Sequence, residues 1–260
     1  MLTIFSAERG ILKAIAKGAR KPGAKMSGRS DFLCVNELFL APGRAFEVIT
    51  QAQTIDNFAA IRTNLDSLTY ALYYAELTAC FGPGLEDDAE EYFQFLCDSL
   101  RLLAEASSDQ LSLCLEFEMG LLDFLGYKPE LTFCIVCRVP LDDFRLGKFN
   151  VEHGGIVCSA CLQKSRRLAV NESSEFELQQ EHRELSQGIH ITPLVWKTLI
   201  LRSQRNLTPV SAMNSSLTNE QVRKASQRIL QAYIEHRASR RFKVLDLLSQ
   251  MQTGLRFQKK

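Results

Sequence analysis

The first 55 residues alternate short apolar runs with turn signals, a pattern that predicts β-strands. Four runs stand out, at 2–5, 11–16, 32–40 and 45–52. Glu8-Arg9-Gly10 separates the first two, and Ala41-Pro42-Gly43-Arg44 joins the last two as a hairpin connection. Short strands with tight turns are typical of a small barrel or sandwich. The segment therefore predicts a β-domain over residues 1–55.

From about Asp56 the apolar residues follow the helical period. Leucine and phenylalanine recur every three or four residues in three stretches, at 58–77, 92–103 and 111–125. Gly82-Pro83 ends the first stretch, and Gly126 ends the third. Further helices are predicted at 175–186, 193–203 and 219–250. The expected fold class is α+β, with the β-domain followed by a mostly helical domain over 56–260.

A cluster of four cysteines interrupts the helical domain. Cys134 and Cys137 form one C-x2-C, and Cys158 and Cys161 form a second after twenty intervening residues. Two residues between cysteines allow both sulfurs of one turn to reach the same ion, and two such turns complete the tetrahedral shell that zinc prefers. Strand-like residues around Gly154 predict a hairpin between the pairs. We predict an inserted zinc ribbon at about 132–163 that holds one Zn²⁺ per chain.

A shell of four thiolates leaves no position open for water or substrate, so the predicted zinc is structural. The alternatives are a redox pair or unrelated buried thiols, but a redox C-x-x-C usually stands alone at the start of a helix. The spacing of His153 from the cysteines does not match that of a zinc ligand, and we interpret it as a surface residue of the hairpin. Arg138 follows the first pair, where zinc turns often carry glycine, so a strained turn is expected. The four isolated cysteines are interpreted as core residues: Cys34, Cys80, Cys97 and Cys114.

Composition is that of a soluble globular protein, but the charge is unevenly distributed. The 260 residues are 46% hydrophobic and 23% charged, with a net charge of +1. Residues 1–30 and 195–260 are basic and residues 76–130 are acidic, which indicates separate surfaces for separate partners. The chain contains no run of about 18 apolar residues, and its N-terminus does not have the pattern of a secretory signal. We expect a cytoplasmic protein with no membrane partner.

Seven basic side chains fall close together near the N-terminus, on strand edges and on a Gly-rich loop. They are Arg9, Lys13, Lys17, Arg20, Lys21, Lys25 and Arg29. Each cation placed against a phosphate releases condensed counterions, and a small barrel with a basic groove is a common design for binding single strands. We predict that these residues bind nucleic acid; the alternative is a solvated loop without a ligand. Four aromatic residues either supply base stacking or, for most of them, belong to the core: Phe5, Phe32, Phe39 and Phe46.

A second basic group lies near the C-terminus and comprises Arg237, Arg240, Arg241 and Lys243. It either extends the nucleic-acid surface, binds an acidic partner peptide, or caps a helix. Catalytic motifs are missing, since the sequence has no P-loop, G-x-G-x-x-G, G-x-S-x-G or H-E-x-x-H. The acidic run 86–91 is typical of a helix N-terminus, and a metal-dependent hydrolase or nuclease built on it is the least favoured hypothesis. We predict a protein that is not an enzyme and has no small-molecule substrate.

Several stretches, taken in their order, resemble one family, the bacterial recombination mediator RecO. LTIFSAERGILKAIAKGAR at the N-terminus is similar to the family's second and third strands and the basic loop after them. LLDFLGYKPEL (121–131) is similar to its helix before the cysteines, CIVC and GGIVCSAC to its zinc ribbon, and YIEHRASRRFKVL (233–245) to its last helix. The resemblance implies an N-terminal OB-fold barrel, and because Leu2 matches the second strand, either the first strand lies upstream of Met1 or the barrel is incomplete.

The same resemblance implies a function in DNA repair. Members of the family bind single- and double-stranded DNA, anneal complementary strands, and work with RecR to load RecA onto strands coated by single-strand-binding protein (SSB). Contact with the acidic C-terminal tail of SSB would need a basic, partly apolar pocket in the helical domain. The protein would be cytoplasmic and nucleoid-associated. The alternative is a zinc-ribbon adaptor that binds RNA or a protein partner without annealing.

Overall fold

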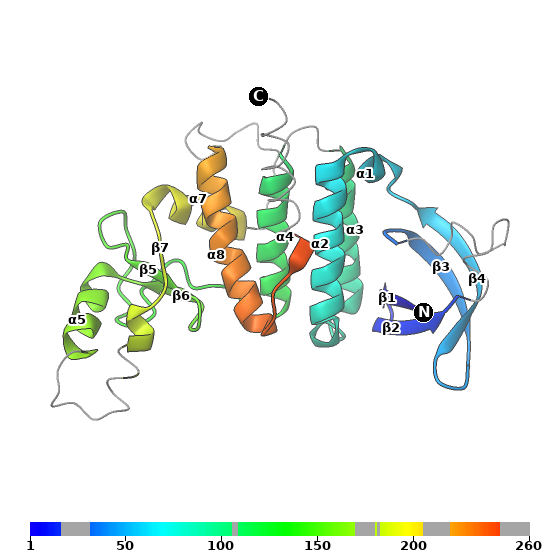
Figure 1. The fold of residues 1–260 in the computed structure, drawn as a ribbon, viewed down its shortest axis with the longest axis horizontal. Helices are drawn as coiled ribbons and strands as arrows, with labels where there is room; N and C mark the ends of the chain where they lie inside the picture. Colours follow the sequence, from blue (N-terminus) through cyan, green and yellow to red (C-terminus); the bar gives the residue numbers. More distant parts are fainter. Residues whose placement is uncertain (17–31, 106–108, 170–179, 181–182, 205–218, 245–260) are drawn as a thin grey trace. The chain divides into compact units, whose positions relative to one another are not determined.

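The structure is a computed structural model, and it describes residues 1–16, 32–105, 109–169, 180, 183–204 and 219–244 (Figure 1). The chain forms two compact units. The first comprises Met1–Leu113 and a segment that begins at Phe242, and the second comprises Cys114–Arg241. Strands and helices are both present, as expected for the α+β class. The division into domains at residue 55 stays a prediction.

The first unit begins with a four-stranded sheet in the order β1-β2-β4-β3. Its strands are β1 (Leu2–Ser6), β2 (Gly10–Ile15), β3 (Val35–Ala41) and β4 (Glu47–Asp56). Neighbours β1–β2 and β3–β4 are antiparallel, whereas β2 and β4 pair in parallel at the end of β2. Within the described residues β1 and β3 do not pair with each other, so these four strands alone do not close a barrel.

The alternation of side chains along the strands separates a core face from an outer face. Ala14, Ile49 and Ala52 are buried, and Leu38 and Leu40 pack against them. Because successive residues of a strand point to opposite faces, Lys13 and Phe39 lie on the other side of the sheet, and both are exposed. The β4 strand extends four residues beyond the predicted end at Ala52, since its polar end residues still pair with β3.

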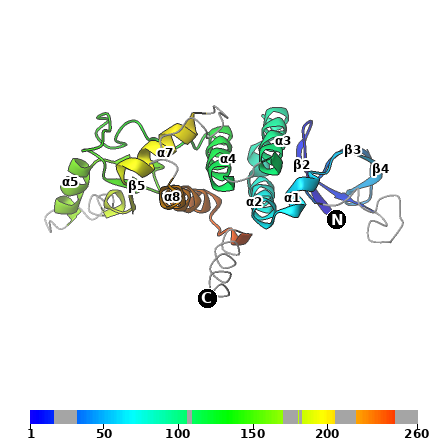
Figure 2. The same ribbon diagram turned by 90° about the horizontal axis from the view of Figure 1, so that it is seen from above.

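Helices of the first unit follow the predicted stretches with one difference. They are α1 (Ala59–Thr63), α2 (Leu65–Phe81), the short 3-10 helix η1 (Gly82–Gly84) and α3 (Ala89–Glu105). A single helix was expected over 58–77, but Asn64 adopts an extended conformation and breaks it. Its side-chain Oδ1 accepts the Ser67 N–H at 3.0 Å, which satisfies one donor at the start of α2. The side chains of Tyr73, Tyr74 and Leu77 are fully buried. Strands β2, β3 and β4 lie on the same side of α2 and α3 (Figure 2).

The second unit combines helices with a three-stranded sheet in the order β6-β5-β7. Helix α4 (Gln110–Phe124) leads into it, and the remaining elements are β5 (Lys148–Asn150), β6 (Gly155–Val157), α5 (Ser159–Ala169), β7 (Ile189–His190), α7 (Pro193–Ser203) and α8 (Glu220–Ala238). The bounds predicted for α7 are confirmed. The helix begins there because the Thr192 side chain accepts the Val195 N–H and Pro193 occupies the first turn. The sequence did not indicate α5 or β7.

Two predicted helices fall partly outside the described residues. Of the stretch 175–186, the structure describes residue 180 and residues 183–186, which are helical. The helix predicted at 219–250 ends as α8 at Ala238, where Ser239 adopts a left-handed conformation with φ 50. In the part of the chain that the structure describes, no helix is long and apolar enough to cross a membrane.

Candidate metal centre and basic surfaces

The four clustered cysteines come from two turns of the second unit. Cys134 and Cys137 lie in a tight turn that two backbone hydrogen bonds close. The Cys134 N–H donates to the Val139 carbonyl at 3.0 Å, and the Arg138 N–H donates to the Cys134 carbonyl at 2.9 Å. Cys158 follows β6, and Cys161 lies in the first turn of α5. The predicted hairpin is confirmed, since β5 and β6 return the chain from the first turn to the second.

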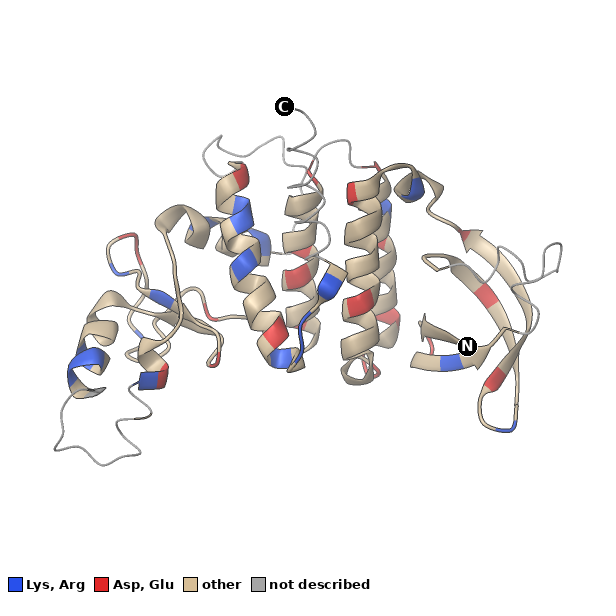
Figure 3. Ribbon diagram, viewed as in Figure 1, with Lys and Arg blue, Asp and Glu red and all other residues tan. Residues whose placement is uncertain are grey.

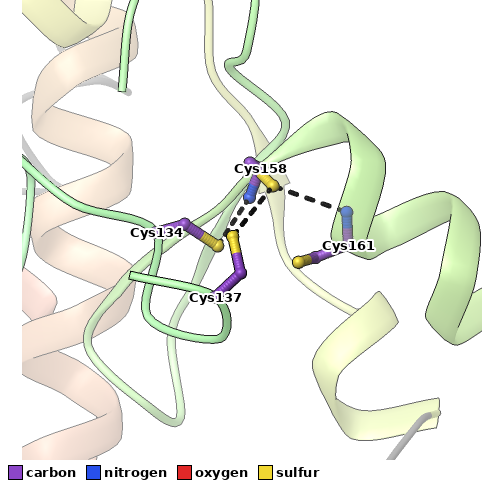
Figure 4. A group of neighbouring side chains, drawn as sticks. All are labelled: Cys134, Cys137, Cys158 and Cys161. Atoms are coloured by element: carbon purple, nitrogen blue, oxygen red, sulfur yellow. Dashed lines mark hydrogen bonds between the residues drawn. The ribbon is translucent and has the colours of Figure 1, made fainter. Parts of the chain in front are cut away.

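The sulfurs of these cysteines point toward one another (Figure 4). All four Sγ atoms lie within 4.8 Å of one another, and the Cys137 and Cys158 Sγ atoms are 3.8 Å apart. Sulfurs bound tetrahedrally to zinc at about 2.3 Å are separated by roughly 3.8 Å, so the arrangement fits that ion with little adjustment. Cys134 and Cys158 are buried, Cys161 is half-buried and Cys137 is exposed. The residues fit a closed four-sulfur shell.

The surroundings shift the pKa values of the clustered thiols in different directions. Burial raises the pKa of the Cys134 thiol, but hydrogen bonds from the Cys137, Cys158 and Val136 backbones outweigh burial and bring it to about 7. The Cys158 N–H donates to the Cys134 Sγ at 3.3 Å. Burial raises the pKa of both Cys158 and Cys161, and the charge of Cys134 raises both further. A bound divalent cation would favour the thiolate form of all four cysteines and release their protons.

Backbone pairing attaches the first cysteine turn to the hairpin. The Ile135 N–H donates to the Ile156 carbonyl at 3.0 Å, and the Glu130 N–H donates to the Gly154 carbonyl at 2.9 Å. Gly154 has φ +65, and a Cβ there would lie 2.2 Å from the Tyr233 hydroxyl oxygen. Glycine is therefore required at this position by backbone conformation and by the close approach of α8.

Side chains of α7 and α8 hold the ribbon in the second unit. Trp196 donates its indole N–H to the Leu131 carbonyl at 2.7 Å. Tyr233 donates its hydroxyl to the Tyr127 carbonyl at 3.0 Å, and its ring meets Phe149 edge-on at 5.6 Å. The ribbon is therefore packed on two helices that the chain forms much later, rather than standing apart as an independent finger.

Several interpretations of single residues can be compared with the structure. Arg138 has φ 57, so the predicted strain at that turn is confirmed. His153 is exposed in the turn between β5 and β6, as interpreted. Among the isolated cysteines, Cys97 and Cys114 are buried, and burial raises the pKa of Cys97 to about 11. Cys34 and Cys80 are only half-buried, so they lie at the margin of the core.

Of the seven basic residues near the N-terminus, the structure describes two. Lys13 is exposed on β2, and no partner for it lies within the described residues. The guanidinium of Arg9 is engaged instead by Glu47, with Nη1 3.1 Å from Oε1 and Nη2 2.6 Å from Oε2. This pairing lowers the pKa of Glu47. The remaining five lie outside the described residues: Lys17, Arg20, Lys21, Lys25 and Arg29.

The interpretation of most N-terminal phenylalanines as core is wrong. Phe32, Phe39 and Phe46 are 63%, 53% and 40% exposed, whereas Phe5 packs edge-on against Tyr92 with ring centroids 5.1 Å apart. Residue type alone favours burial, but strand alternation decides it, because the core face of β3 is taken by Leu38 and Leu40. The strand register was the signal that would have placed Phe39 on the outer face.

The acidic run 86–91 leads into α3, which begins at Ala89 with Glu90 and Glu91 in its first turn. Its interpretation as a helix N-terminus is confirmed. Within the described residues, the four ribbon cysteines form the one group of three or more ligand-type side chains close enough to share an ion. Figure 3 shows the acidic residues of α2 and α3 and the basic residues of α8.

Two family models match the chain. One is described as Recombination protein O N terminal and covers residues 1–58, and the other as Recombination protein O C terminal and covers residues 62–183. A protein of Heliobacterium modesticaldum named DNA repair protein RecO is 30% identical over 245 residues, which cover 87% of this chain and 88% of that protein. The chain belongs to the RecO family. The resemblance seen in the sequence is thereby confirmed.

Other RecO relatives align over a shorter part. Those of Desulforamulus reducens and Dehalococcoides mccartyi, both named DNA repair protein RecO, are 35% identical over 168 residues and 37% identical over 163 residues. The alignments cover 64% and 62% of these two proteins, so the chain spans less than two thirds of their length. The match of the RecO C-terminal model ends at residue 183 and includes all four ribbon cysteines.

We expect the purified, reduced chain to contain about one zinc per chain, measured by elemental analysis. Cys158→Ser should lose most of the metal and lower the midpoint of thermal unfolding, because it removes a buried ligand and the folding free energy of the ribbon depends on the ion. Cys80→Ser is the matched control, since it changes a half-buried thiol outside the ribbon and should retain the metal. Wild-type protein without metal would contradict the assignment.

Proposed function

We propose that this chain is a DNA-binding recombination mediator that is not an enzyme. It binds single- and double-stranded DNA, anneals complementary strands, and helps to load RecA onto SSB-coated DNA together with RecR. Membership of the RecO family carries the proposal, and the relatives' name, DNA repair protein, supports it. In this proposal the N-terminal sheet is part of an OB-type barrel, and the protein works at the nucleoid.

The outer face of the N-terminal sheet supports DNA binding there. It combines an exposed cation, Lys13, with the exposed ring of Phe39. Two further exposed rings are close in sequence, since Phe46 directly precedes β4 and Phe32 lies three residues before β3. Lys and Arg contacts supply salt-dependent affinity for phosphates, and aromatic rings supply stacking that tolerates any base. The five basic residues outside the described part of the chain would add charge to the same unit.

Zinc has a structural role in this proposal. Cys134, Cys137, Cys158 and Cys161 would hold the ion, which would tie the first turn to the start of α5 and so keep the ribbon packed on α7 and α8. The closed shell of four sulfurs gives the ion no open position for substrate. Impaired DNA handling in a cysteine variant would therefore follow from loss of fold.

A protein-binding adaptor is the second candidate, and one observation favours it. The ribbon exposes several apolar side chains, namely Phe133, Val136, Val139 and Phe144, of which Phe144 is 94% exposed. Exposed apolar groups of this kind often mark protein contact sites. An adaptor would use this surface without annealing DNA, so the annealing measurement separates the two candidates.

Annealing of two complementary labelled strands, without ATP and at low salt, tests the proposed function. We expect the chain to accelerate annealing, and the effect to fall steeply as salt rises, because phosphate contacts release counterions. Strand annealing at the spontaneous rate, together with a preference for RNA or no nucleic-acid binding, would support the adaptor instead.

Charge changes on the N-terminal sheet should move DNA affinity in opposite directions. Lys13→Gln should lower the slope of log K against log salt for single strands by about 0.7, the value for one lost phosphate contact. Glu47→Gln should raise affinity, because it removes a negative charge and releases Arg9 from its ion pair. Fluorescence anisotropy across a salt series measures both. Glu91→Gln, an equal charge change on α3, is the control and should bind like wild type.

Stacking by Phe39 can be measured in the same way. Phe39→Ala should weaken binding of single strands by about tenfold, within the range for loss of one base–aromatic contact, and affect duplex much less because its bases are already stacked. Phe144→Ala removes an even more exposed ring from the second unit and should leave affinity unchanged. Equal losses for single strands and duplex would argue against stacking at Phe39.

A further inference from the structure

The second unit contains a pocket of about 420 Å³ that is separate from the cysteine cluster. It lies between the loop after α4, the turn joining β5 to β6, and the C-terminal part of α8. Its polar lining includes Tyr127, Lys128, Arg138, His153, Tyr233 and Arg237. Four of these six side chains are basic or can become so, and one carboxylate, Glu130, also lines the pocket.

Arg237 is held at the centre of this lining. Its guanidinium carbon lies 5.1 Å from the centre of the Tyr127 ring and 5.0 Å from that of Tyr233, and its Nη2 donates to the Glu152 carbonyl at 3.0 Å. Its Nε is buried and has no hydrogen-bond partner within the described residues. The two rings and the Glu152 carbonyl hold the guanidinium in place, so its positive charge stays at the pocket.

The other cations are only weakly neutralised by the protein. The Arg138 side chain is 72% exposed, and its Nη1 is 3.9 Å from Glu130 Oε2. Lys128 is 45% exposed, with its Nζ 3.4 Å from Asp123. Glu130 uses Oε1 to accept the Thr132 and Phe133 N–H groups, so its charge is partly satisfied by the turn. The pocket therefore keeps a net positive charge.

The hydrogen bonds around His153 indicate which of its two ring nitrogens carries the proton. The Asn150 Nδ2 donates to the Glu184 and Gln187 carbonyls, which leaves the Asn150 Oδ1 as the acceptor from His153 Nδ1 at 3.0 Å. The ring proton of a neutral His153 therefore resides on Nδ1, and Nε2 is left for a protonated ligand or for a proton of its own. An unprotonated phosphate oxygen accepts from a protonated ring, and a terminal hydrogen phosphate also donates to a neutral one.

We propose that this pocket binds a phosphate group of a nucleic-acid strand, an inference that rests on the proposed function. Two guanidinium groups and an ammonium surround the same space, and planar guanidinium donors match phosphate oxygens closely. An acidic peptide is the less favoured occupant, because among the lining residues Ile135 and Leu185 are the purely aliphatic ones and offer little area to a peptide side chain. The phosphate comes either from the internal backbone or from a 5′ terminus.

The experiment compares the full chain with Arg237→Gln, Arg138→Gln and a matched control, Arg145→Gln. Arg145 lies on the same ribbon, 54% exposed and paired with Asp142, and does not line the pocket. Anisotropy with single strands across a salt series should show the slope lowered by about 0.7 in each pocket variant and unchanged in the control. The exposed Arg138 keeps the test valid if Arg237→Gln fails to fold.

Strands with a 5′-phosphate and with a 5′-hydroxyl separate the two sources of the group. A loss confined to phosphorylated strands assigns a terminal phosphate, and equal losses assign the internal backbone. Pocket variants with unchanged slopes would overturn the proposal, while Lys13→Gln with a lowered slope would leave the proposed function standing.

Titration with inorganic phosphate tests the pocket without DNA. We expect NMR shifts of the Gly154 amide and the Arg237 Nε–H in the wild type, and no such shifts in Arg237→Gln. If an aspartate-rich peptide shifts these resonances and phosphate does not, the pocket binds carboxylates and the proposal is wrong. If wild type fails to bind DNA yet shows the phosphate shifts, the proposed function fails while the anion chemistry of the pocket is retained.

Discussion

Four thiolates whose sulfurs lie within 4.8 Å of one another repel each other unless a cation lies among them. The ribbon of the second unit depends on this constraint. The cluster joins two segments that β5 and β6 bring back together, and backbone bonds from Ile135 and Glu130 fix the first turn to the hairpin. The ribbon is then packed under α7 and α8. The same ribbon supplies Arg138 and His153 to the basic pocket, so the ion would order the pocket without taking part in binding.

In the first unit, an ion pair neutralises part of the positive charge. Arg9 is one of the seven basic residues predicted to bind nucleic acid, yet its guanidinium is engaged by Glu47, 38 residues later on β4. Lys13, four residues further on, has no such partner within the described residues. A count of basic residues therefore overstates the cationic surface, since an ion pair between the turn before β2 and strand β4 neutralises part of it.

The sequence was informative where one local rule acted alone. The cysteine spacing predicted the cluster, alternating runs predicted the four N-terminal strands, and the helix predicted at 193–203 has the bounds of α7. Predictions failed where a distant contact decided. Strand β7 exists only because β5 provides an edge for two residues. The break at Asn64 has a different cause, a local cap on Ser67 that the helical period conceals. The pocket combines residues from 126 to 237, and no single motif contains them.

Trp196 gives the second unit an optical reporter that needs no label. It is the single tryptophan of the chain, and its indole N–H donates to the Leu131 carbonyl, three residues before the first ribbon cysteine. Indole emission depends on hydrogen bonding and on exposure to water. Displacement of the first cysteine turn would break this bond, so removal of metal by a chelator can be followed through intrinsic fluorescence as movement of the ribbon away from α7.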